Sequence, residues 1–118
     1  MIQAHVVSRK METSFAIHSV NNRRIERIEM SGHAESGEYG KDLVCAAASA
    51  LVIAFVNSVE VLCGVDLAPE VRSGYVRVTV PSDASVQLLA ESLVVGLEGM
   101  MQDHAKYIVV KHTLHEDL

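Results

Sequence analysis

His33 and Cys45 flank a glycine-rich segment that leads directly into a long apolar stretch. Asp42 stands just before that stretch and is a favoured helix N-cap residue, so a helix that begins at Leu43 would place Cys45 in its first turn. Unpaired backbone N–H groups and the helix dipole favour negative charge at that position. Cys45 is therefore a candidate nucleophile that could act as a thiolate.

His33 is the side chain that could activate this thiol. It lies at the end of a predicted strand, and the glycine-rich residues 32–41 would bring the chain round to the helix start. An imidazole within reach of a thiol can take its proton and later return it to a leaving amine. The first helical N–H groups, including that of Cys45, could bind the oxyanion of a tetrahedral intermediate. The carboxylate of Asp42 opposes a second anion nearby, so we interpret Asp42 as a cap and not as a base.

These residues alone leave other interpretations open. A lone cysteine near a helix start is commonly a small buried residue, a histidine at a strand end is commonly polar surface, and glycines can simply permit a turn. His33, Asp42 and Cys45 could also ligate zinc. A structural zinc site needs four ligands at recognised spacings, and the sequence has no CxxC motif. We therefore expect no metal and no cofactor.

A redox role needs a second cysteine within reach. If one helix carries both Cys45 and Cys63, a rise of about 1.5 Å per residue places them roughly 27 Å apart. A disulfide requires Cα atoms within about 7 Å. Two free thiols fit a reducing cytoplasm.

Hydrophobic patterning predicts the elements that would position the pair. Strands are expected at residues 2–7, 14–20, 24–32, 67–72, 75–80 and 107–114, with turns at 21–22 and 73–74. Helices are expected at residues 43–62 and from Ser82 or Asp83 to about His104, with Gly64 as the left-handed cap of the first. The first helix is apolar all round, which predicts a central position covered by more than one neighbour. The pattern predicts one α+β domain over residues 1–118, in which a mixed or antiparallel sheet packs with two long helices.

Composition limits the classes of partner. Half of the 118 residues are apolar (49%), and 15 acidic residues outnumber 10 basic ones, for a net charge of −5. Because the basic residues are dispersed, we expect no direct nucleic-acid binding. The N-terminus lacks the pattern of a signal peptide, and the longest uncharged run, residues 43–59, is alanine-rich and short for a membrane helix. We therefore expect a cytoplasmic protein with no membrane segment.

The segment from Gly32 to Ser49 reads G-H-A-x-x-G-x-x-G-x-D-x-V-C-A-A-x-S. It closely resembles the signature of the bacterial ribosomal-processing cysteine proteases. The matching positions are Gly32, His33, Ala34, Gly37, Gly40, Asp42, Val44, Cys45, Ala46, Ala47 and Ser49. The sequence departs from the pattern at Ala48, where a larger aliphatic residue is common, and residues 5–25 do not align clearly.

The resemblance implies a cytoplasmic cysteine endopeptidase, usually a homodimer, with His33 and Cys45 as its catalytic dyad. Its implied substrate is the N-terminal extension of large-subunit ribosomal protein twenty-seven, cut after a short hydrophobic segment rich in Phe. The substrate-binding loop and supporting residues would be Gly32, Gly37, Gly40, Asp42 and Ser49. The alternative function is a ribosome-assembly factor that binds the same ribosomal protein without cutting it.

Overall fold

The elements are taken from a computed structural model, which describes residues 1–11, 23–34 and 42–117. In chain order they are β1 (Ile2–Lys10), β2 (Arg23–Ser31), α1 (Leu43–Cys63), β3 (Glu70–Arg72), β4 (Tyr75–Thr79), α2 (Ala84–Asp103), β5 (Ile108–Leu114) and the short 3-10 helix η2 (His115–Asp117). The predicted strand at 14–20, the turn at 21–22 and loop residues 35–41 lie outside the described residues.

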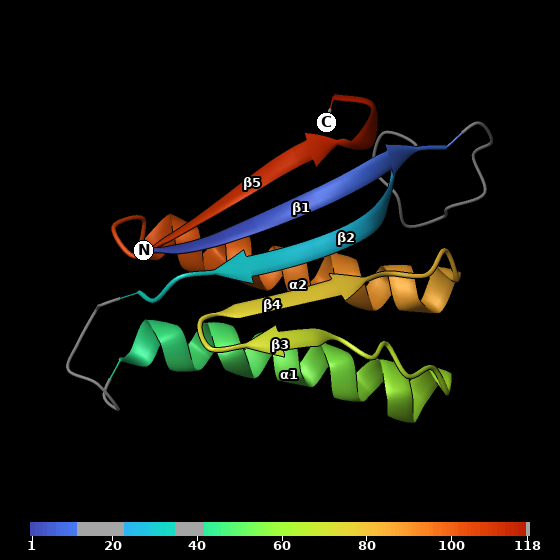
Figure 1. The fold of residues 1–118 in the computed structure, drawn as a ribbon, viewed down its shortest axis with the longest axis horizontal. Helices are drawn as coiled ribbons and strands as arrows, with labels where there is room; N and C mark the ends of the chain where they lie inside the picture. The colour runs from blue at the N-terminus through green and yellow to red at the C-terminus, as the bar shows by residue number, and fades with distance from the viewer. Residues whose placement is uncertain (12–22, 35–41, 118) are drawn as a thin grey trace.

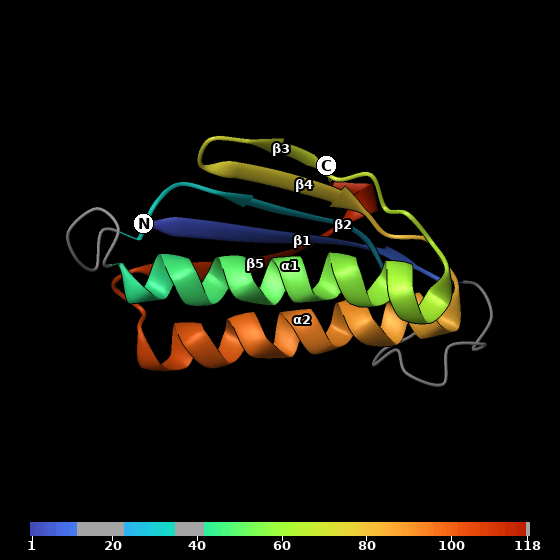
Figure 2. The ribbon, with the colours of Figure 1, turned by 90° about the horizontal axis from the view of Figure 1, so that it is seen from below.

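The five strands form one mixed sheet in the order β3-β4-β2-β1-β5. Only the pairing of β1 with β5 is parallel, and all other neighbours are antiparallel. Figures 1 and 2 show α1 and α2 side by side on one face of this sheet. The predicted α+β class is confirmed, and the central strand β2 is the one that leads to His33.

The predicted helix ends are confirmed by their caps. Asp83 caps α2, because its carboxylate accepts hydrogen bonds from Ser85 N and Val86 N. Gly64 ends α1 in the left-handed conformation (φ 69°, ψ 24°), as its lack of a Cβ allows. The strands differ more from prediction: β1 extends to Lys10, and β3 begins only at Glu70.

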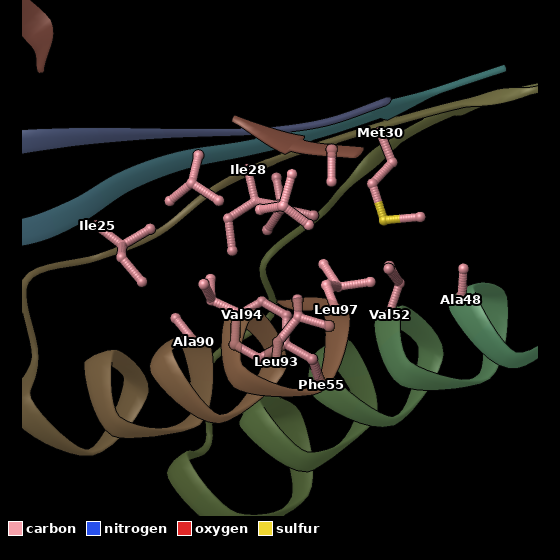
Figure 3. Packing of buried hydrophobic residues seen from close by; sticks show 14 of the residues in the cluster. Ile25, Ile28, Met30, Ala48, Val52, Phe55, Ala90, Leu93, Val94 and Leu97 are labelled. Atoms are coloured by element: carbon pink, nitrogen blue, oxygen red, sulfur yellow. The ribbon is translucent and has the colours of Figure 1, made fainter. Parts of the chain in front are cut away.

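The core lies between the sheet and the two helices. Alternate strand residues point toward the helices, as Ile28 and Met30 of β2 do in Figure 3. They meet Val52 and Phe55 from α1 and Leu97 from α2, all buried. β2 and α1, which carry His33 and Cys45 at or just beyond their ends, are therefore both anchored in the same packed layer.

Gln87 is the buried polar side chain among the described residues, and it ties α2 to β2. Its Oε1 accepts from Ile25 N at 2.8 Å, and its Nε2 donates to Ile25 O at 2.7 Å and Pro81 O at 2.9 Å. Because its amide oxygen and nitrogen are both hydrogen-bonded, its burial carries no large desolvation penalty. The bonds fix the start of β2 against the first turn of α2.

The prediction that α1 is central and covered on several sides is wrong. The two helices form a single layer, so each leaves its outer side uncovered (Figure 2). Large apolar side chains exposed on that layer are Leu43, Ile53, Val61, Leu62, Leu88 and Val95. Both helices are long and apolar enough to cross a membrane by length and composition, a test that the core helix of a soluble protein also passes.

Candidate active site

The first turn of α1 holds Cys45 as the sequence predicts. Asp42 has extended backbone angles, and its Oδ1 accepts a hydrogen bond from Cys45 N at 3.0 Å. Asp42 is therefore the N-cap, and Cys45 is the third helical residue. The same bond corrects one expectation: the N–H of Cys45 is already taken by the cap, so it is not a free donor for an oxyanion.

The sulfur of Cys45 has a backbone donor that sequence analysis missed. Ala34 N donates to Cys45 Sγ at 3.1 Å. Ala34 is 2% exposed and belongs to the core, so its N–H is held firmly in this direction. The Cys45 sulfur is therefore oriented by a fixed backbone donor. The sequence signal was present, since Ala34 follows His33 in the motif, but a backbone N–H leaves no mark in a side-chain pattern.

Gly32 directs the chain from β2 toward His33. The β2–β4 ladder ends at the pair Ser31 and Tyr75, and Gly32 N then donates to Gly74 O at 2.9 Å. Gly32 has a φ of +90°, and a Cβ there would lie 2.3 Å from the backbone oxygen of Met1. A side chain at position 32 would therefore be both strained and blocked by backbone. The motif glycine is needed for this turn.

His33 and Cys45 line one cavity of about 380 Å³. It lies between the β3–β4 hairpin and the first half of α1, both of which contribute lining residues. Apolar residues dominate the lining, among them Val52, Ile53, Val56, Pro69, Val71 and Val76. Such a mostly apolar pocket with a few polar groups is typical of a ligand site.

The two candidate catalytic side chains share the cavity without being hydrogen-bonded to each other in the described part of the chain. His33 is exposed, whereas Cys45 is half-buried. Catalytic hydrogen bonds are commonly long in free enzymes and tighten when substrate binds. The arrangement thus places an acid–base group and a thiol around the same space.

The hairpin contributes Arg72 and Tyr75 to the lining of the cavity. The guanidinium carbon of Arg72 lies 4.4 Å from the centroid of the Tyr75 ring, within cation–π distance. Arg72 Nη2 also lies 3.6 Å from Glu70 Oε1, an exposed pair that contributes little to stability. Sequence analysis assigned no site role to this hairpin, because its residues gave only a strand pattern.

The other predicted site residues divide into three groups. Gly32 and Ser49 line the cavity with His33 and Cys45, whereas Asp42 acts on the helix start. Gly37 and Gly40 lie outside the described residues. Over the described ranges, no three His, Cys, Asp or Glu side chains gather in a way that could hold a metal ion. The cavity itself brings together a thiol and an imidazole.

Comparison with known proteins gives a consistent result. Residues 12–109 match the family described as cysteine protease Prp. The ribosomal processing cysteine protease Prp of Bacillus subtilis is 34% identical over 96 residues, which covers 75% of this chain and 86% of that protein. The Staphylococcus aureus protein of the same name is 29% identical over 89 residues, covering 72% and 84% respectively.

Solved structures extend the likeness to the fold. SMU.848 from Streptococcus mutans has a TM-score of 0.77 at 32% identity, over 98% of this chain and 99% of that one. Prp from S. aureus, solved with a covalently linked product peptide, has a TM-score of 0.70 at 22% identity, over 93% and 99%. With the family match covering most of the described elements, this chain belongs to the cysteine protease Prp family.

Proposed function

We propose that Cys45 is the nucleophile of this cysteine protease and that His33 is its general acid and base. The observation that carries the proposal is the placement of the sulfur. It lies in the first turn of α1, receives the Ala34 N–H, and faces the cavity that His33 also lines. The first two features bring backbone N–H groups to the sulfur, and the third places it beside a group that can exchange a proton with it.

The reaction would proceed in two halves. His33 takes the proton of the Cys45 thiol, and the thiolate attacks the carbonyl carbon of the scissile peptide. The carbon–nitrogen bond then breaks, His33 protonates the leaving amine, and a thioester joins the acyl part to Cys45. In the second half His33 takes a proton from water, the hydroxide attacks the thioester, and the thiol is released with its proton restored.

We propose the N-terminal extension of large-subunit ribosomal protein twenty-seven as the substrate. The apolar cavity beside Cys45 would take the hydrophobic, Phe-rich segment that precedes the cut. The net charge of −5 would favour a basic ribosomal protein as partner. In support, the related S. aureus protease has been solved with a substrate peptide and with a product peptide.

Cleavage of a synthetic peptide that spans this extension and its junction tests the proposal. Mass spectrometry should show one cut by the wild-type protein. Cys45→Ala and His33→Ala should each lower kcat/KM by at least about 1,000-fold, because the members of a catalytic unit act together. Cys63→Ala is the matched control and should cut normally.

Cleavage that survives both active-site substitutions would overturn the assignment of the dyad. Tight binding of the peptide without any cut, and equally in Cys45→Ala, would favour the non-catalytic assembly factor instead.

We also propose that the protein works in the cytoplasm as a homodimer that uses the outer face of the helix layer. The thiols of Cys45 and Cys63 are free, which fits a reducing compartment. The helix layer exposes large apolar side chains, Val61 at 80% and Val95 at 69% among them. In the first half of α1, Ala46, Ala47, Ala50 and Ala54 are also exposed, so that a second helix layer could approach closely.

Light scattering on the purified protein should give twice the chain mass. Val95→Glu should produce monomers, because it would bury a charge in the proposed interface. Glu70→Gln on the exposed edge strand β3 is the control and should leave the mass unchanged. A wild-type monomer, or a dimer that tolerates Val95→Glu, would contradict this interface.

A further inference from the structure

The turn between β3 and β4 touches the ring of His33. A Cβ atom added at Gly74 would lie 2.9 Å from His33 Nε2 and 3.4 Å from its Cε1. Real Cβ atoms essentially never come within 3.0 Å of another heavy atom, so the contact with Nε2 could not form without a shift. The outer edge of the imidazole therefore packs on the space that a side chain at position 74 would fill.

The same glycine also fixes the backbone from which His33 projects. Gly74 O accepts the hydrogen bond from Gly32 N at 2.9 Å, one residue beyond the last β2–β4 pair. Gly74 is thus hydrogen-bonded through its backbone to Gly32, the residue before His33. Because Gly74 has no side chain, the His33 ring can lie close to its Cα. Gly74 and His33 line the cavity together with Cys45.

We infer that Gly74 is a positioning residue for His33. Because Gly74 has no side chain, the imidazole packs on its Cα, and this packing site, called the seat below, sets the position of the ring relative to the Cys45 thiol. This inference rests on the proposed function, in which His33 transfers protons to and from Cys45. Packing Nε2 against Gly74 restricts the ring on one side and leaves it access to the cavity. A Cβ at position 74 would push the ring off this seat, and misplacing a catalytic group by about 1 Å can cost roughly 100-fold in rate.

The chain supplies a matched control for the backbone strain of the test variant. Gly74 has a φ of +68° and Gly64 has a φ of +69°, so an alanine at either position suffers the same left-handed strain. At Gly64 an added Cβ meets nothing within 4 Å, whereas at Gly74 it meets His33. Comparing Gly74→Ala with Gly64→Ala therefore separates contact with the imidazole from loss of stability.

Both variants should lose a similar amount of thermal stability. Gly74→Ala should lower kcat on the extension peptide by about 100-fold with little change in KM, and should shift the pH profile of kcat/KM. Gly64→Ala should keep the wild-type kcat and pH profile. Wild-type kcat in Gly74→Ala, or an equal loss in Gly64→Ala, would overturn the inference.

Nuclear magnetic resonance makes the test independent of the substrate, and its measurement on the wild-type protein does not depend on the folding of any variant. In the wild-type protein, the ring protons of His33 should show nuclear Overhauser contacts to the α protons of Gly74. In Gly74→Ala the His33 ring resonances should move, while those of His112 should stay. If the wild-type protein does not cut the peptide, the proposed function fails. If the ring contacts to Gly74 are absent, only the inferred positioning of His33 by Gly74 is overturned.

Discussion

The two cysteines at opposite ends of α1 differ in their backbone surroundings although their burial is alike. Both are free, both are half-buried, and both pack against the core. Cys45 lies in the first turn, where helix N–H groups favour an anion, and receives the Ala34 N–H. Cys63 is the last helical residue, where unpaired carbonyl groups disfavour an anion. The two thiols therefore differ in their backbone surroundings and not in their exposure, and the proposed assignment of Cys45 as the nucleophile rests on that difference.

The comparison predicts different rates of alkylation. With iodoacetamide at neutral pH, Cys45 should label at least about tenfold faster than Cys63, because, of the two, only Cys45 lies at a helix start and receives a backbone N–H on its sulfur. Peptide mapping after short exposure would report each site separately. The ratio should shrink as pH rises and both thiols ionise.

Labelling in urea is the control, because unfolding removes the helix and should make the two rates equal. Equal rates in the folded protein would remove the physical basis for assigning Cys45 as the nucleophile.

The sequence predicted the helix that carries both cysteines better than it predicted their surroundings. Asp42, Cys45 and Gly64 stand where local rules place a cap, a first-turn residue and a left-handed end, so these positions were correct. The exposed outer face of α1 was missed because apolar periodicity measures hydrophobicity and not the number of neighbours. In a single layer of two helices, an apolar side can remain uncovered.

The site shows the same limit. His33 and Cys45 were found because the motif records side chains, and they do line one cavity. The Ala34 N–H on the sulfur and the contact of Gly74 with His33 were not predicted. Both depend on how β2, the hairpin and α1 meet in space, which requires strand pairing between distant residues. The sequence motif identifies the candidate side chains. The tertiary fold determines which backbone N–H groups and neighbouring residues contact them.

A new cysteine in α2 would separate the two causes that act on Cys45. Ser85 is exposed in the first turn of α2, and its N–H donates to the cap Asp83 Oδ1 at 3.0 Å. Ser85→Cys would give a thiol with a helix start but without a counterpart of the Ala34 N–H. In a background of Cys45→Ala and Cys63→Ala, its rate of alkylation by iodoacetamide at neutral pH should fall between those of Cys45 and Cys63.

The differences in reactivity among Cys63, the new thiol and Cys45 measure the contribution of the helix start and that of the Ala34 N–H. The step from Cys63 to the new thiol compares the two ends of a helix and is expected to be about tenfold, since each exposed helix terminus is worth roughly 0.3–1 kcal/mol and the two effects add. The step from the new thiol to Cys45 reports the Ala34 hydrogen bond together with the cavity. If the new thiol matches Cys45, the helix start alone accounts for the reactive cysteine. If it matches Cys63, the dipole contributes little, and the fixed backbone donor from Ala34 is what makes this end of α1 reactive.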